Sequence, residues 1–542
     1  MSPISRYCIA AVLLLSASNL CAQILPPPPV EHQRRLSEAP RTFVREFRFE
    51  GNTVFSATEL AEVTRPFTNR ELTTEDLEQA RRAVSLHYVN HGFLNSGAVI
   101  PDQDPENGII RLRILEGTLS EVELRGNRWL RDWYIKNHVR RWSRPPLNVT
   151  KLQEGLQLLR ENPNVKQINA ELKPGVSPGE SLLDLRVEDR QPFRFGIQID
   201  NQRPPSVGEE QLWLLASDLN LTGHSDPLDL RYGLLNSDGD GYEFSGADNM
   251  EAAYRFPVGP FGTTLGLLAS RRDTRLVEET FATLDIESQT TSYGVTLRQS
   301  IYQTANDEVA LSLGFDHRKN RTWLLGERFS LSPGADRGEM AVSALRFSQE
   351  WVTRRLNQVL ALRSTFNFGV DVLDATDNGA VGQPNATFFH WLGQGQYARR
   401  LFDTQNEVVL RAMGQWTSEP LLALEQFSVG GFETVRGYLE NQLVRDRGFV
   451  SSVEFRLPLL YNKTGAGILH VAPFFDFGGA WNVHESPDPT TIASTGLGLL
   501  FTPNKHASAQ IYWGYRLRHI ERPDDAHAQG AGIGFKININ AF

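Results

Sequence analysis

One feature of the sequence restricts the fold more than any other: from Phe193 to the end, apolar and polar residues alternate in one run after another. The clearest runs are residues 193–199, 250–256, 309–315, 449–457, 497–501 and 511–517, with Gly, Asn, Asp and Pro clusters between them. A period of two predicts strands with one apolar and one polar face. Long alternating strands with aromatic residues near their ends are typical of a transmembrane β-barrel. A large soluble β-sandwich or a β-helix is the alternative.

The size of this region sets the number of strands. Residues 192–542 are predicted to form the barrel, and spanning strands of about ten residues with their connections suggest an even number, about sixteen. Outside it, only residues 9–18 resemble a membrane helix, and they are too few to span a bilayer. Because only helices and closed barrels satisfy the backbone in lipid, the barrel is the favoured reading.

The N-terminus has the composition of a secretory signal peptide, predicted at residues 1–22. Both cysteines, Cys8 and Cys21, lie inside it, so the mature chain is expected to have no disulfide, thiolate metal site or thiol chemistry. Residues 23–41 follow as a proline-rich linker, in which residues 31–41 are the candidate for a short plug helix.

Between the linker and the barrel lies an internal repeat with an offset of 75 residues. Residues 47–56 align without a gap with residues 122–131, and each copy ends its strand in Gly-Asn, a dipeptide suited to a turn. The first copy is followed by a predicted capping box, Thr73 with Asp76, which opens a helix. The helical apolar faces are Leu77, Ala80, Val84 and Tyr88 in the first copy, and Leu152, Leu156 and Leu159 in the second. Two domains, 42–117 and 118–191, are therefore predicted, each in the order strand, helices, strand, strand.

Candidate metal and catalytic motifs are weak. His87 and His91 have zinc-like spacing but lack the glutamate of a zincin, so a solvated helix face is favoured. Residues 236–241 resemble the start of a calcium loop, but Ala247 stands where the bidentate glutamate belongs, so a hairpin turn is favoured. The sequence contains no P-loop and no Gly-Xaa-Ser-Xaa-Gly elbow, and we expect neither a cofactor nor an enzyme. A net charge of −9 argues against a nucleic-acid partner.

A more informative pattern lies at residues 429–442, VGGFETVRGYLENQ. Gly430, Gly431 and Gly437 surround the single cation Arg436 between two predicted strands. Downstream, FFDFGGAW at residues 474–481 places Phe475 and Phe477 on one strand face and Asp476 on the other. If the aromatic face meets lipid, Asp476 points into the lumen.

Together these features resemble the outer-membrane transporters of two-partner secretion, the haemolysin secretion/activation type. The sequence Val435-Arg436-Gly437-Tyr438 is similar to the family's loop motif. The stretch with Phe474, Asp476 and Gly478 is similar to its second motif. The resemblance covers essentially the whole mature chain. It implies an α+β part with two periplasmic polypeptide-transport-associated (POTRA) domains, followed by an all-β barrel of sixteen strands.

The resemblance also implies a mechanism. The loop folds back into the lumen, where Arg436 pairs with Asp476; we expect this site to be wet, which would weaken the pair. The POTRA domains bind a large unfolded exoprotein in the periplasm, by accepting it as an added strand. Its folding outside the cell then drives transport without nucleotide hydrolysis. The implied partners are this exoprotein, the lipid of the Gram-negative outer membrane and the barrel-assembly machinery during biogenesis, and the protein is expected to be a monomer.

The competing reading is a factor that assembles or inserts other outer-membrane barrels, which shares the plan of POTRA domains, barrel and loop motif. Two repeats rather than a longer row favour transport. Phe542, a C-terminal aromatic of the kind that marks such barrels, lies out of phase with the alternation of residues 535–541 unless a bulge intervenes.

Overall fold

The structure is a computed structural model of the chain. It describes residue 36 and residues 41–541, apart from 236–248, 260–261, 278–283, 379–381, 403–404 and 521–526. Four predicted features lie outside the described residues. They are the signal peptide, nearly all of the linker with its candidate plug helix, the calcium-like residues 236–241, and Phe542. The chain divides into two compact units, Met1–His87 with Gly97–Leu115, and Tyr88–Ser96 with Glu116–Phe542.

The first unit is a small α+β domain. Its elements are β1 (Thr42–Val44), β2 (Glu46–Glu50), α1 (Ala57–Thr64), η2 (Arg65–Phe67), β3 (Arg70–Leu72), most of α2 (Thr74–Asn90), β4 (Gly97–Val99), η3 (Glu106–Gly108) and β5 (Ile109–Leu115). The main sheet has the order β2-β5-β4, and β1 pairs with β3 in a second sheet. That second pair was not predicted, because strands of three residues carry no periodicity.

The helix of the first repeat begins as predicted. Thr73 and Asp76 form a capping box, in which the Thr73 amide donates to Asp76 Oδ2 at 2.9 Å and the Asp76 amide donates to Thr73 Oγ1 at 3.2 Å. The predicted apolar face of α2 is buried along its whole length. Its burial supplies the energy that a single helix in water lacks.

The second repeat has the same element order. It contains β6 (Thr118–Arg125), α3 (Asp132–Trp142), α4 (Val149–Arg160), β7 (Val165–Pro174) and β8 (Glu180–Asp189), with sheet order β6-β8-β7. Leu152 and Leu159 are buried in its core, and Leu156 packs against that core. In both sheets the last strand runs parallel to the first and lies between the other two. The predicted repeat is therefore a structural repeat.

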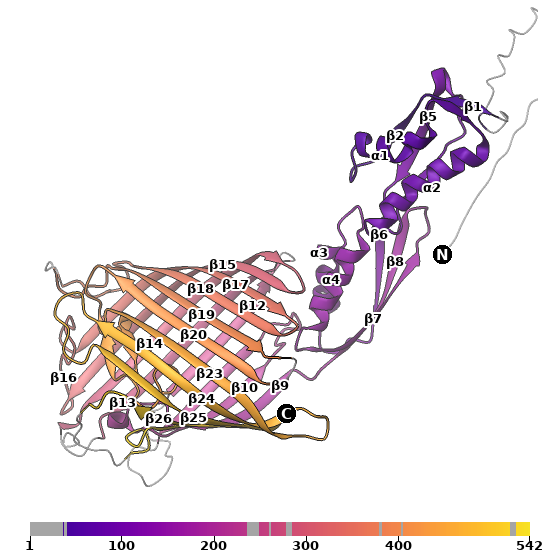
Figure 1. Cartoon of the computed structure of the whole chain (residues 1–542). Helices are drawn as coiled ribbons and strands as arrows, with labels where there is room; N and C mark the ends of the chain where they lie inside the picture. The colour runs from indigo at the N-terminus through magenta and orange to yellow at the C-terminus, as the bar shows by residue number, and fades with distance from the viewer. Residues whose placement is uncertain are drawn as a thin grey trace, which may run out of the picture. The chain divides into compact units, whose positions relative to one another are not determined.

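The remainder of the second unit is a closed antiparallel barrel (Figure 1). Its strands are β9 (Phe193–Asp200), β10 (Gln211–Asp218), β11 (Leu228–Leu235), β12 (Asn249–Val258), β13 (Thr263–Arg275), β14 (Glu287–Gln303), β15 (Asp307–Leu324), β17 (Glu339–Arg355), β18 (Gln358–Gly369), β19 (Phe389–Arg400), β20 (Glu407–Thr417), β23 (Arg447–Tyr461), β24 (Gly467–Trp481), β25 (Thr491–Asn504), β26 (Ala507–Arg516) and β27 (Ile533–Asn540). Among the described strands, the two-residue β16 (Glu327–Arg328) has a residue-by-residue pairing with the end of β15 alone, while β15 pairs directly with β17. Within the described residues the barrel therefore has the predicted sixteen strands.

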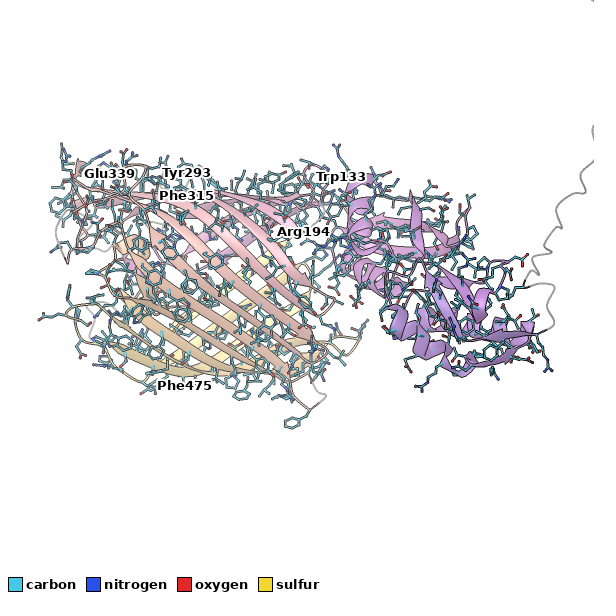
Figure 2. The ribbon with its side chains drawn as sticks, turned by 90° about the horizontal axis from the view of Figure 1, so that it is seen from above. Trp133, Arg194, Tyr293, Phe315, Glu339 and Phe475 are labelled. Carbon is cyan, nitrogen blue, oxygen red and sulfur yellow. The ribbon has the colours of Figure 1, made fainter. Side chains whose placement is uncertain are left out.

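The alternation in sequence becomes two faces of the barrel wall. Apolar side chains such as Tyr293 and Phe475, 60% and 47% exposed, lie on the outer surface (Figure 2). Their sequence neighbours face inward, as the period of two requires. No helix among the described residues is long and apolar enough to cross a membrane.

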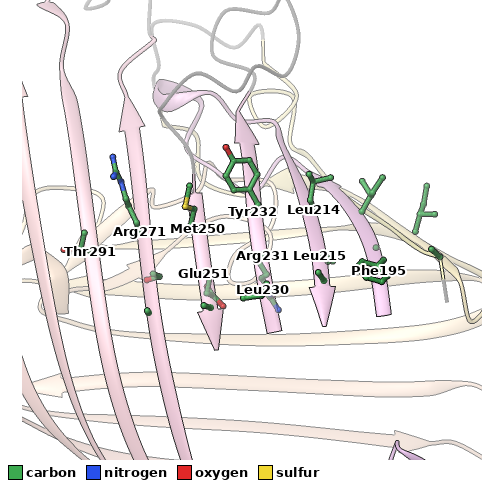
Figure 3. A pocket seen from close by; sticks show the side chains of 18 of the residues that line it. Phe195, Leu214, Leu215, Leu230, Arg231, Tyr232, Met250, Glu251, Arg271 and Thr291 are labelled. Carbon is green, nitrogen blue, oxygen red and sulfur yellow. The ribbon is translucent and has the colours of Figure 1, made fainter. Parts of the chain in front are cut away.

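A recess of about 950 Å³ lies on the lipid-facing side of strands β9–β14 (Figure 3). It forms because Ala216, Ala252 and Ala269 stand in one register row of the wall, which also holds Leu230. Larger outward side chains, including Leu214 and Met250, border it. None of the described residues that line the recess belongs to the loop with Arg436.

Candidate functional site

The segment with the predicted loop motif leaves the barrel wall between β20 and β23. It forms η6 (Ala423–Glu425), then β21 (Phe427–Val429) and β22 (Leu443–Arg445), which pair with each other as a separate hairpin. The loop 430–442 joins these two short strands. Gly430, Gly431 and Gly437 all have positive φ, so the backbone turns in ways that other residues rarely adopt.

The structure brings Arg436 and Asp476 together. The guanidinium binds the carboxylate at two points, from Nε to Oδ2 and from one terminal nitrogen to Oδ1, both at 2.8 Å. The backbone amide of Arg436 adds a third bond to Oδ2 at 3.0 Å. This two-point geometry is available to arginine and not to lysine.

Two aromatic rings complete the surroundings of the arginine. The guanidinium carbon lies 3.7 Å from the centre of the Phe474 ring and 4.6 Å from that of Tyr512. Both distances are within the range of cation–π attraction. Phe474 shares the inward face of β24 with Asp476, so one strand supplies both a carboxylate and a ring to the same cation.

Sequence reasoning missed Glu454 on β23. Its carboxylate accepts a short hydrogen bond from Arg436 and another, at 2.7 Å, from Arg456 Nε. The Tyr512 hydroxyl donates to it at 3.1 Å, and an Arg411 nitrogen lies 3.6 Å away. Strand pairing places Ser452, which accepts from Arg436 at 3.1 Å, directly opposite Asp476. The signal that could have revealed Glu454 is a carboxylate between Val453 and Phe455 on a membrane strand.

The expectation of a wet site is wrong. Arg436 is 3% exposed, and Asp476 and Glu454 are both 0% exposed. The loop packs so closely on the wall here that the charges of Arg436, Asp476 and Glu454 are enclosed by protein atoms. A buried charge of this kind requires a partner, since desolvation is costly without one.

Close packing depends on glycines at two places. A Cβ on Gly437 would lie 2.5 Å from the Gly514 carbonyl oxygen of β26, too near for any side chain. A Cβ on Gly478 would lie 2.7 Å from the Val429 side chain and 3.0 Å from that of Val435. These glycines therefore allow the loop to lie directly on the wall.

Tyr438 fixes the loop on the side facing β25 and β26. Its ring is buried, and its hydroxyl lies 3.0 Å from the Ala493 carbonyl oxygen and 2.9 Å from that of Arg518. Arg516 Nε donates to the Gly437 carbonyl at 2.6 Å. All the residues of the two predicted motifs thus lie on the loop or on the wall beneath it.

The loop leaves part of the lumen open. A cavity of about 460 Å³ lies beside it and is lined by residues that include Glu350, Arg363, Arg411 and Glu433.

Of the two histidines with zinc-like spacing, His87 lies 3.2 Å from Glu59. Among the described residues, no group of three or more His, Cys, Asp or Glu side chains could hold a metal ion.

Comparison with known proteins identifies the family. The model of the haemolysin secretion/activation protein family ShlB/FhaC/HecB matches residues 179–501, and that of the ShlB-type POTRA domain matches residues 42–117. The outer membrane transporter CdiB of Dickeya dadantii is 26% identical over 93% of this chain and 87% of its own length. The heme/hemopexin transporter protein HuxB of Haemophilus influenzae is 22% identical over 82% and 78%.

Solved structures agree on the fold. CdiB from Escherichia coli superimposes with a TM-score of 0.71 at 21% identity, over 96% of this chain and 93% of that one. BamA from Haemophilus ducreyi, lacking its first three POTRA domains, gives a TM-score of 0.53 at 12% identity over 92% and 100%. The resemblance inferred from the two motifs and the repeat is confirmed: this chain belongs to the haemolysin secretion/activation protein family ShlB/FhaC/HecB.

Proposed function

We propose that this protein is the transporter of a two-partner secretion pair and moves one large exoprotein across the outer membrane. The barrel lies in the outer membrane, and the POTRA part lies in the periplasm. The observation that carries the proposal is the loop bound inside the barrel by the buried Arg436–Asp476 pair. A pore that contains a bound loop can open when the loop moves.

The site residues have distinct roles in this proposal. Arg436 holds the loop on the wall, Asp476 and Phe474 receive it, and Gly430, Gly431, Gly437 and Gly478 allow the close approach. Val435 and Tyr438 fill the apolar contact between loop and wall. These roles concern the position of the loop and involve no chemical reaction.

Residues 42–117 and 118–191 act as two POTRA domains that bind the unfolded exoprotein. In the second domain, β6 pairs only with β8 among the described strands, so its other edge is open to an added strand. Beside that edge is a groove of about 490 Å³ lined by Glu121, Lys136, Arg140 and Arg144, among others. An extended chain paired with β6 would place alternate side chains in this groove.

The remaining parts of the proposal follow from the family. The signal at residues 1–22 directs export, and the linker at residues 23–41 precedes the first domain. The barrel-assembly machinery inserts the protein, which acts as a monomer without a cofactor or catalytic activity. Folding of the exoprotein outside the cell supplies the driving force.

The test is to search for a large exoprotein encoded beside this chain and to measure whether its release depends on this chain. Removal of the chain is expected to abolish release of that exoprotein while the amounts of other outer-membrane barrels stay unchanged. A general loss of outer-membrane barrels would instead support the assembly-factor reading. The better superposition on CdiB than on BamA favours transport.

A further inference from the structure

A second buried ion cluster lies where the loop segment leaves the wall, and neither sequence motif includes it. Its centre is Glu425, the last residue of η6. Its carboxylate accepts hydrogen bonds from two nitrogens of Arg346 on β17, at 2.7 and 3.1 Å. His390 Nε2 on β19 lies 3.0 Å away. The Glu425 side chain is only 2% exposed.

The surroundings make this cluster a built site. Arg346 also donates to Asp316 Oδ2 at 3.0 Å and to Asn367 Oδ1 at 2.7 Å. Arg318 on β15 donates to the Leu424 carbonyl at 3.2 Å and lies 3.6 Å from the Glu425 carboxylate. The positive charges of Arg346 and Arg318 balance the negative charges of Glu425 and Asp316. Removing Glu425, which is 2% exposed, would leave one positive charge in excess on Arg346 and Arg318, which are 19% and 35% exposed.

The Glu425 cluster and the Arg436 cluster use different arcs of the barrel. Glu425 binds side chains of β15, β17 and β19, whereas Arg436 binds β23 and β24 and packs on Tyr512 of β26. In barrel order β20 separates these two sets of strands. The segment is therefore held at its start and at its tip by ion pairs that share no residue.

We propose that Glu425 is a positioning residue, a second anchor that fixes the start of the loop segment on β15–β19 independently of the Arg436 anchor at its tip. Its role in secretion rests on the proposed function, but the anchoring itself does not. Withdrawal of the whole segment from the lumen requires both anchors to break. Release of the tip alone leaves residues 421–426 in place.

The test uses cysteine labelling of the purified barrel, with both native cysteines removed or replaced. Leu422 and Val435, both 0% exposed, become single-cysteine reporters for the start and the tip of the segment. Glu425→Ala is expected to raise the labelling rate at the start about tenfold and leave the tip rate unchanged. Arg436→Ala is expected to raise the labelling rate at the tip by about 10²-fold or more and to leave the rate at the start unchanged. Glu425→Asp, which keeps the charge, is expected to restore slow labelling in part.

The matched control is Glu350→Ala. Glu350 is also an inward carboxylate paired with arginine, Arg298 at 2.9 Å, but it is bonded to the wall and not to the loop segment. The Glu350→Ala substitution is expected to leave both labelling rates unchanged. Heat-modifiable gel mobility confirms that each variant is a folded barrel.

An unchanged labelling rate at the Leu422 position in folded Glu425→Ala would overturn the proposal. An equal rise in the labelling rates at the Leu422 and Val435 positions in that variant would also overturn it. Neither measurement needs the exoprotein. If the proposed transport function fails, the labelling result still stands. If the labelling result contradicts the second anchor, the proposed transport function still stands.

Discussion

Substitution of Arg436 tests the role of the loop most directly. Its side chain makes two hydrogen bonds to Asp476, one to Glu454 and one to Ser452. In Arg436→Ala, Glu454 still has Arg456 at 2.7 Å, so most of the uncompensated charge falls on Asp476. Breaking one side of a buried pair costs about 3–5 kcal/mol. That corresponds to a change of about 10² to several times 10³ in the ratio of bound to released loop.

The barrel itself should survive this change, because its wall is held by strand pairing all the way round. We therefore expect Arg436→Ala to insert normally and to secrete little exoprotein. Arg436→Lys keeps the charge but loses the two-point bond, at a cost of about 1.5–3 kcal/mol per hydrogen bond lost to a charged group. Its secretion should be intermediate. Asp476→Ala should share part of the defect.

The double variant Arg436→Ala with Asp476→Ala is the sharper measurement. It removes both partners, so no carboxylate is left unpaired, and the loop should be released less than in Arg436→Ala alone. Exchange of the two residues tests whether charge pairing is sufficient for secretion. Arg445→Ala is the matched control, because Arg445 is a buried arginine of the same hairpin that donates to the Pro487 carbonyl at 2.9 Å. Normal secretion by a well-folded Arg436→Ala variant would refute the role given to Arg436.

Three further predictions follow from other parts of the chain. Deletion of residues 42–191 should leave an inserted barrel that secretes nothing; normal secretion would disprove capture by these domains. Deletion of residues 430–442 should raise ion conductance in planar bilayers, and an unchanged conductance would mean that the loop does not restrict the pore. Burial lowers the pKa of His138, whose Nε2 donates to the Gly155 carbonyl at 2.8 Å. As pH falls, His138 is therefore protonated in the unfolded chain at a higher pH than in the folded domain. The second POTRA domain should therefore lose stability as pH falls below about 6.5, the pKa of histidine in the unfolded chain. His138→Gln should reduce this pH dependence. Chemical unfolding at several pH values measures both.

Much of the fold was predictable because it depends on local periodicity. The alternating runs, the capping box of Thr73 and Asp76 and the apolar face of α2 each depend on residues a few positions apart. The inward direction of Asp476 followed from the same rule, since its neighbours Phe475 and Phe477 are aromatic. Its pairing with Arg436 came from the resemblance to a known family, because no local pattern relates residues 40 positions apart.

The parts that sequence reasoning missed depend on register and on long-range contacts. Glu454 reaches Arg436 because strand pairing sets Ser452 opposite Asp476, a register that the turn between β23 and β24 does not reveal. Glu425 meets Arg346 across 79 positions, because the segment that follows β20 folds back over β19 to β15 inside the barrel. The depth of burial at Arg436 was misjudged for a related reason. A loop in a pore suggests water, whereas the close contact of Gly437 with Gly514 excludes it.

The choice of charged residues for this contact has a physical reason other than stability. A buried ion pair often stabilises a protein no more than a well-packed apolar pair of similar volume, so an apolar loop tip could bind the wall as strongly. Apolar contact is non-directional, however, and would tolerate shifts of the loop along the wall. The Arg436 fork fixes distance and orientation to Asp476 at two points, and the rings of Phe474 and Tyr512 restrict it further. The arginine therefore defines one position for the loop, and the glycines around it allow the backbone to reach that position.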